Sequence, residues 1–150
     1  MGEPFRYLHR VSYAECTVGN HIYYSRYLDL FEAARGGFFR AIGHPISSLQ
    51  LAGYIFPVME CDVRYRHAAR YDDEVVVAVR LIELTKVRLV FEHSMSHSNH
   101  ELLAEGRITH AVTGLNEKPK RLTQELFQAF RTRLEQASDR DNVSLGRSVE

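Results

Sequence analysis

The chain has 150 residues, of which 45% are hydrophobic and 25% are charged, so it is long enough to bury the core of one soluble globular domain. Its 19 Lys and Arg residues balance 19 Asp and Glu residues, which gives no reason to expect nucleic acid or an anionic membrane as a partner. No apolar run approaches the ~18 residues of a transmembrane helix, so we expect no membrane span.

The cysteine and histidine content argues against the common metal motifs. Cys16 and Cys61 form no CxxC pair, and the 8 histidines lack ligand spacing, so no metal and no cofactor are expected. Two thiols in a chain without a recognisable secretory signal are typical of a reduced, cytoplasmic protein.

The first predicted element is a half-buried strand over residues 5–15, because apolar and polar side chains alternate along it. The residues expected on its buried face are Phe5, Tyr7, His9, Val11 and Tyr13.

A long amphipathic helix is predicted to follow, with Ser25 as its N-cap and Gly43 and Pro45 as its stop signal. Its apolar stripe consists of Tyr27, Leu30, Phe31, Ala34, Phe38, Ala41 and Ile42. Gly36 and Gly37 each cost about 1 kcal/mol relative to alanine inside a helix. They indicate that a curved sheet packs very close to this helix, unless they are simply a tolerated defect in helix propensity.

The remainder of the chain predicts a connector or short helical turn, four strands and a second amphipathic helix. The connector or helical turn is residues 44–53. The strands are residues 54–66, 74–83, 86–97 and 102–114, and the helix is residues 122–136. Pro57 cannot donate to a strand ladder, so its strand is expected at a sheet edge or a bulge. Short turns between the later strands predict an antiparallel sheet and an α+β fold. We expect a single domain over 1–137 and a polar, disordered tail over 138–150.

Three segments carry a resemblance to a known family. They read NHIYYSRYLDLFEAARGGFFRAIG, RYDDEVVVAVRLIEL and LLAEGRITHAV, within a region from about Phe5 to Leu126. These segments resemble the hot-dog fold of the 4-hydroxybenzoyl-CoA thioesterase-like family of acyl-CoA thioesterases. The resemblance implies a long helix wrapped by a curved antiparallel sheet. It also implies a homodimer or tetramer whose sheets join edge to edge, with active sites at the subunit boundary.

The loop before the long helix departs from the family pattern. The family's loop reads like Asp-x-x-Gly-His/Val-Val-x-x, and its Asp is the nucleophile or general base. Thr17 stands at the position of that Asp, and Asn20 stands at the position of the glycine. A threonine without a base cannot do a carboxylate's work at neutral pH. The segment ECTVGN is also similar, with one residue of shift, to the ETNLVGN loop of enediyne polyketide thioesterases, which rely on an Asn and an Arg. Asn20 and Arg35 would be the counterparts.

The resemblance assigns further catalytic candidates. The backbone N–H of Tyr24 would polarise the thioester carbonyl, or its ring would simply pack on the sheet. Asn20 would contact the same carbonyl, or would be a turn residue in the left-handed conformation. Glu32 would be a catalytic carboxylate on the helix, or an ion-pair partner of Arg35 or Arg26.

Three residues are expected to bind substrate. Phe31, with residues 55–59, is expected to line an acyl pocket. Lys86 and Arg88 are expected on the phosphates of CoA, or are exposed strand charges.

Together these features predict an enzyme that hydrolyses acyl-CoA thioesters. The alternatives are a carrier-protein thioesterase of the enediyne polyketide type and a non-catalytic hot-dog protein that binds acyl thioesters. The mechanism that we expect from sequence is attack by water on a thioester held by the Tyr24 N–H, with Asn20 as a second polar contact. On that mechanism the Glu32 carboxylate is dispensable.

Overall fold

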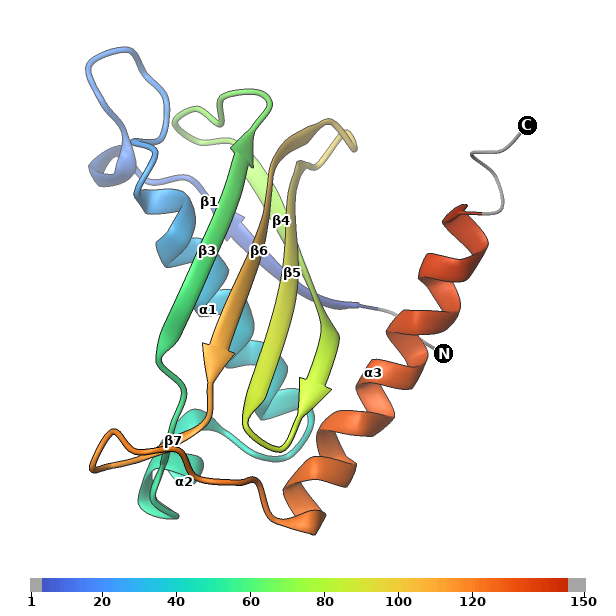
Figure 1. The fold of residues 1–150 in the computed structure, drawn as a ribbon. Coiled ribbons are helices and arrows are strands. Elements are labelled where there is room, and N and C mark those ends of the chain that lie inside the picture. The colour runs from blue at the N-terminus through green and yellow to red at the C-terminus, as the bar shows by residue number, and fades with distance from the viewer. Residues whose placement is uncertain (1–3, 146–150) are drawn as a thin grey trace.

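The computed structural model describes residues 4–145, with side chains described as far as residue 134 (Figure 1). Its elements follow the expected order of a strand, a long helix, several strands and a final helix. They are β1 Phe5–Arg10, a 3₁₀ turn Tyr13–Glu15, α1 Arg26–Ala41, α2 Ile46–Leu51, β2 Tyr54–Ile55, β3 Val58–Tyr65, β4 Glu74–Thr85, β5 Arg88–His97, β6 Leu102–Ala111, β7 Thr113–Gly114 and α3 Gln124–Leu145.

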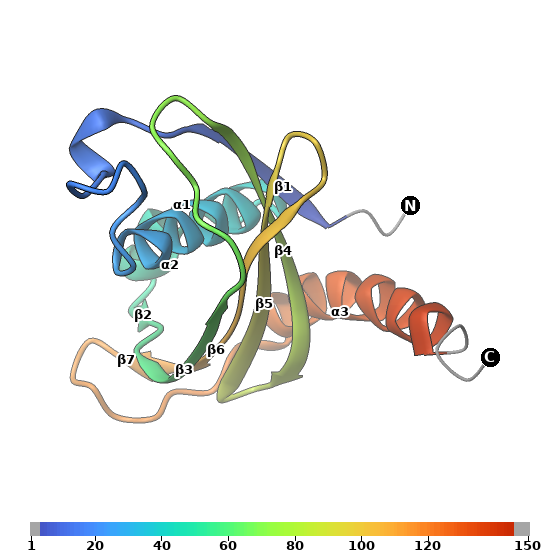
Figure 2. The same ribbon diagram turned by 90° about the horizontal axis from the view of Figure 1, so that it is seen from above.

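Five strands form one antiparallel sheet in the order β1-β4-β5-β6-β3, and β2 pairs with β7 separately. The sheet curls around α1, whereas α3 lies on the other side of the sheet (Figure 2). This arrangement confirms the predicted α+β hot-dog architecture. No helix among residues 4–145 is long and apolar enough to cross a membrane.

The inner face of α1 is the centre of the hydrophobic core. Five residues of the predicted stripe are buried, namely Tyr27, Leu30, Phe31, Ala34 and Phe38. Ala41 is exposed, which differs from the prediction, and Phe39 is buried instead. Ser25 takes the N-cap position as expected, although its side chain makes no capping hydrogen bond.

Two glycines mark the points where α1 and the sheet come closest. A Cβ added to Gly37 would overlap the ring of Phe5 on β1. A Cβ added to Gly106 on β6 would lie 2.9 Å from the ring of Phe31 on α1, which is closer than normal packing allows. The prediction of close packing is therefore correct for Gly37. Gly36 is different, since its Cβ would meet only the guanidinium of Arg40 at 3.6 Å.

The strand expected over 54–66 is divided at Pro57 into β2 and β3. β3 is an edge strand of the five-stranded sheet, and its register against β6 shifts between Val58 and Glu60. Pro57 therefore lies directly before an edge strand whose pairing is irregular at its start, which agrees with the prediction made from its missing N–H.

The first strand is shorter than expected. β1 ends at Arg10, and Tyr13 belongs to the 3₁₀ turn with its side chain 80% exposed. The cause is Glu15, whose carboxylate accepts hydrogen bonds from the backbone N–H of Ser12 at 2.7 Å and from its hydroxyl at 2.9 Å. These local bonds compete with continuation of the strand.

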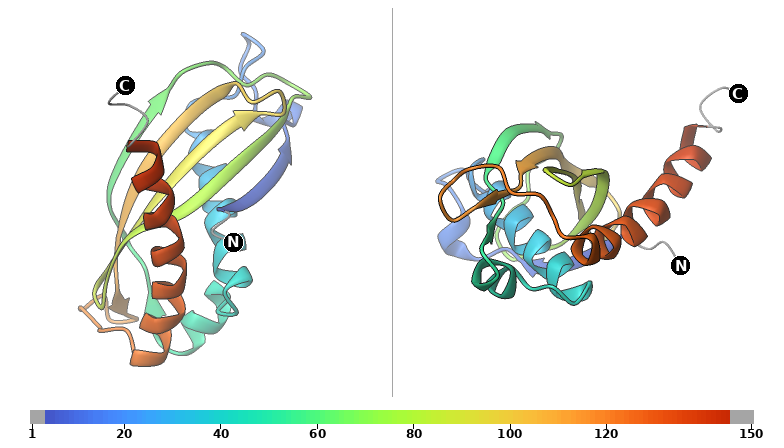
Figure 3. Two further views of the ribbon diagram at one scale, coloured as in Figure 1. Left: turned by 90° about the vertical axis from the view of Figure 1, so that its right-hand side faces the viewer. Right: turned by 60° about the horizontal axis from the view of Figure 1, so that its bottom comes forward.

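The C-terminal helix α3 is longer than the predicted 122–136 and reaches Leu145. It packs along β4 at the lower end of the sheet (Figure 3), where the fully buried ring of Phe130 meets the ring of Phe39 at 5.6 Å between centroids. Residues 146–150 of the expected disordered tail lie outside the described residues.

The two helix glycines give a matched test of close packing. We expect Gly36→Ala to stabilise the fold by about 0.5–1 kcal/mol, because it adds helix propensity without a clash. We expect Gly37→Ala to destabilise it by about 1 kcal/mol or more, because Phe5 must move. Urea unfolding of both variants measures the difference, and equal effects would contradict close packing at Gly37.

Candidate active site

A cavity of about 710 Å³ runs beside α1 and is the main candidate for a binding site. Its apolar wall includes the aromatic side chains Tyr7, Phe39, Tyr54 and Phe56. Ile46 of α2 and Ile55 of β2 extend this wall, as do the small α1 residues Ala33 and Gly36. Mostly apolar walls with a few polar groups are typical of small-molecule sites.

Four charged side chains of α1 also line the cavity, namely Asp29, Glu32, Arg35 and Arg40. Asp29 pairs with Arg26 at 3.3 Å. Glu32 is exposed and forms no ion pair within 4 Å among the described side chains, so neither of the two ion pairs suggested for it from sequence is formed. Glu32 is therefore a carboxylate on the cavity wall that is available to a ligand or a water molecule.

Arg35 lies over two buried histidines of the sheet. Its Nη1 donates to Nε2 of His93 on β5 at 3.4 Å, and His93 stacks on Phe31 with 4.9 Å between ring centroids. Burial, and then the charge of Arg35, lower the pKa of His93 to about 3. On β6, burial likewise lowers the pKa of His110 to about 4, although its ring Nδ1 donates to the carbonyl of Phe56 at 3.0 Å. Both imidazoles are therefore neutral at pH 7.

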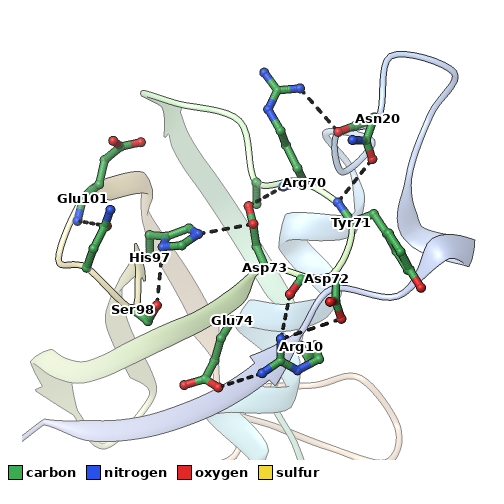
Figure 4. Close-up of polar contacts among 12 residues, drawn as sticks. Arg10, Asn20, Arg70, Tyr71, Asp72, Asp73, Glu74, His97, Ser98 and Glu101 are labelled. Carbon is green, nitrogen blue, oxygen red and sulfur yellow. Dashed lines mark hydrogen bonds and ion pairs between the residues drawn. The ribbon is translucent and has the colours of Figure 1, made fainter.

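The loop that carries Thr17 and Asn20 is a tight turn tied to a neighbouring loop. The Thr17 N–H donates to the carbonyl of His21 at 2.9 Å, and the Asn20 N–H donates to the carbonyl of Thr17 at 3.0 Å. Asn20 has a φ of 56° and accepts at its side-chain oxygen from the N–H of Tyr71 at 3.4 Å. Arg70 donates to the Asn20 carbonyl at 3.4 Å (Figure 4). Neither Thr17 nor Asn20 lines the cavity.

Tyr24 directly precedes the N-cap residue of α1, has an exposed side chain and, like Thr17 and Asn20, does not line the cavity. The hydroxyl of Tyr65 on β3 donates to its carbonyl at 3.0 Å, and the two rings meet edge to face. The Tyr24 backbone N–H has no acceptor among the described residues. An open N–H at a helix N-terminus can stabilise negative charge on a carbonyl oxygen.

The three expected substrate-binding residues lie elsewhere. Phe31 is fully buried and does not line the cavity, whereas Ile55 does. Lys86 and Arg88 lie at the β4–β5 turn. This turn is at the opposite end of the sheet from the start of α1 (Figure 1). Lys86 lies over the ring of Phe127. Arg88 pairs with Glu83 at 3.5 Å.

His93 and His110 were not identified as site residues from sequence. A signal was present, since His93 alternates with the apolar residues Phe91 and Met95 and so occupies an inward-facing strand position. No group of three or more potential metal-ligating side chains occurs among the described residues.

A sheet wrapped around one helix, with a cavity beside that helix, defines a hot-dog protein. A model of the thioesterase-like superfamily matches residues 11–131, and the chain belongs to this superfamily. It is 29% identical over 126 residues to the acyl-CoA thioesterase YbgC of Haemophilus influenzae. The aligned region covers 81% of this chain and 90% of that protein.

Solved structures share the fold of this chain. A hypothetical protein of Thermus thermophilus superposes with a TM-score of 0.81 at 30% sequence identity. The match covers 85% of this chain and 98% of the Thermus thermophilus chain. A Staphylococcus aureus protein solved in complex with CoA shares the fold, with a TM-score of 0.78 at 13% identity, over 90% of this chain and 84% of its own.

The two histidines predict a steep acid dependence of stability. The unfolded chain takes up protons below pH ~6.5, whereas folded His93 and His110 stay neutral until about pH 3 and 4. Stability therefore falls as the pH falls through this window, by up to about 1.4 kcal/mol per pH unit for each histidine.

We expect His93→Gln to reduce the slope of unfolding free energy against pH by about 1.4 kcal/mol per pH unit between pH 6 and 4, which corresponds to one proton. Urea unfolding at several pH values measures it, with His67→Gln, a change at an exposed histidine, as the control. An unchanged slope in His93→Gln would contradict a neutral buried imidazole.

Proposed function

We propose that the protein is an acyl-CoA thioester hydrolase, which converts an acyl thioester and water into a carboxylic acid and a thiol. The observation that carries this proposal is the unpaired carboxylate of Glu32 on the wall of the cavity beside α1. The superfamily to which the chain belongs and the name of its Haemophilus influenzae relative support the same chemistry.

In the proposed mechanism, Glu32 acts as the general base. It takes a proton from a water molecule as the water oxygen attacks the thioester carbon, and the carbonyl oxygen becomes an oxyanion. The open N–H of Tyr24 stabilises that oxyanion at the start of α1. The oxyanion then reforms the carbonyl as the C–S bond breaks, and protonated Glu32 returns the proton to the departing thiolate, which leaves a carboxylic acid and a thiol.

Asn20 receives a different role from the one expected from sequence. Its side-chain oxygen contacts the Tyr71 N–H, and its positive φ is typical of a turn residue. We therefore propose that Asn20 orients the loop before α1. Thr17, whose backbone closes the same turn, shares this role.

The proposed carrier is CoA, and the solved relative in complex with CoA supports this choice. Lys86 and Arg88 remain proposed contacts of the CoA phosphates. They lie at the far end of the sheet from Tyr24, so we propose that they act across a subunit boundary. We place the reaction in the cytoplasm, since both cysteines are free thiols.

We propose a homodimer, or a tetramer of such dimers, that forms through β3. This edge strand has an almost entirely exposed surface, including Val58, Met59 and Tyr65 at 54%, 68% and 45% exposure. An open apolar edge is a template for pairing with another strand, and a twofold axis would pair β3 with its copy.

Two substitutions separate the candidate catalytic groups. We expect Glu32→Gln to lower kcat about 100-fold or more, because the amide cannot accept the water proton. Asn20→Ala should lower kcat by less than about tenfold and mainly loosen the loop. Release of thiol from acyl-CoA esters measures both.

The reverse result, with Asn20→Ala inactive and Glu32→Gln active, would restore the mechanism expected from sequence. Turnover only of carrier-protein thioesters would identify the carrier-protein alternative. No turnover of any acyl thioester, despite binding, would identify a non-catalytic binding protein.

The oligomer can be tested with two matched surface changes. The wild-type chain should scatter light as a dimer or a multiple of dimers of the 17.3 kDa chain. Met59→Lys should weaken association, because it places two like charges near one another across the paired edge. Leu51→Lys, at an exposed apolar residue of α2, should leave association unchanged. A monomeric wild type at micromolar concentration would overturn the proposal.

A further inference from the structure

Arg35 is a partly buried cation that has no anionic partner among the described side chains. Within the described part of the chain, its only hydrogen bond is to His93 at 3.4 Å, a long contact with a neutral acceptor. Removal from water lowers the pKa of Arg35 below its ordinary value, although the negative charge of Glu32 acts in the opposite direction. Arg35 nonetheless stays protonated, because arginine is charged in proteins at any physiological pH.

The neighbouring groups leave most of this charge uncompensated. His93 and His110 are neutral, and each keeps one buried ring nitrogen without a hydrogen-bond partner. Glu32 influences Arg35 only through its field, since no carboxylate oxygen lies within 4 Å of the guanidinium. A buried charge without a partner is costly, so such groups are normally paired or bind a ligand.

The place of Arg35 on the cavity wall indicates where its partner binds. Around it the wall is mostly aromatic and aliphatic, with Phe39, Tyr54 and Phe56 among its members. Arg40 adds a second cation to the same cavity and forms no ion pair among the described side chains. Two carboxylates also line the cavity, but Asp29 is paired with Arg26, and Glu32 lies more than 4 Å from the Arg35 guanidinium. A ligand that fits this cavity combines an apolar body with an anionic group.

We propose that the cavity binds an acyl group whose far end carries a carboxylate, so that the preferred substrates are monothioesters of dicarboxylic acids. This inference rests on the proposed function, which places the acyl group of a thioester in the cavity. The guanidinium of Arg35 pairs with the distal carboxylate, and the aromatic wall packs on the methylene chain. Arg35 is then a residue that determines specificity.

A phosphate of CoA is the other possible source of an anion. The apolar wall favours the acyl carboxylate, because phosphates are usually held by several donors at an exposed site. The two sources predict different results when Arg35 is changed. A distal carboxylate affects only the substrates that carry one, whereas a phosphate contact affects every CoA compound equally.

The experiment compares matched acyl-CoA pairs of equal chain length: succinyl with butyryl, adipyl with hexanoyl, and suberyl with octanoyl. Values of kcat/KM are measured for the esters, and Kd values are measured by calorimetry for their non-hydrolysable thioether analogues. In the wild type, we expect the carboxylate member of at least one pair to be favoured roughly 10- to 100-fold in both quantities.

Variants of Arg35 and Arg40 identify the cation responsible. Arg35→Met and Arg35→Gln should abolish the preference, Arg35→Lys should retain part of it, and Arg40→Met should keep it. The inference would be overturned if the wild type showed no preference for the carboxylate member of any pair. It would also be overturned if the Arg35→Met and Arg35→Gln variants kept that preference. An equal loss of affinity for free CoA and for both members of each pair would overturn it as well. If the analogues bind with the expected preference and no ester is hydrolysed, the hydrolase proposal fails and this inference stands.

Discussion

The close approach of α1 to the inner face of the sheet is the constraint on which the rest of the structure depends. The approach is possible only where a side chain is missing, at Gly37 opposite Phe5 and at Gly106 opposite Phe31. The core beneath α1 is filled by buried side chains such as Phe31 and Phe91. The available space lies along the flank of the helix, where Ala33 and Gly36 are small and where Glu32 and Arg35 project. The tight packing of one helix face thus determines which face can bind a substrate.

Much of the fold could be predicted from local sequence patterns. Strand alternation, the apolar stripe of α1 and the missing donor of Pro57 each report on one element and its nearest neighbours. The predictions failed where distant or competing contacts decide the structure. Glu15 ends β1 by binding Ser12. Phe39 is buried because Phe56, Phe91 and Phe130 pack around its ring. Neither set of contacts has a periodic signature in the sequence.

The candidate site was less predictable for the same reason. Glu32 and Arg35 could be identified as helix residues with catalytic chemistry, but not as neighbours of one cavity. His93 and His110 come from two strands, and only the pairing of β5 with β6 brings them beneath Arg35. A sequence pattern can place an imidazole on the inward face of a strand. It cannot reveal that the imidazole will be the neutral acceptor of a partly buried guanidinium.

One ring joins the cavity to the C-terminal helix. Phe39 lines the cavity on one side and packs against Phe130 of α3 on the other. A ligand that moves the Phe39 ring therefore also changes the free energy with which α3 docks on the sheet, and by thermodynamic linkage the docking of α3 changes ligand affinity by the same factor. The docking of α3 and the affinity of the cavity for its ligand thus both depend on the position of the Phe39 ring.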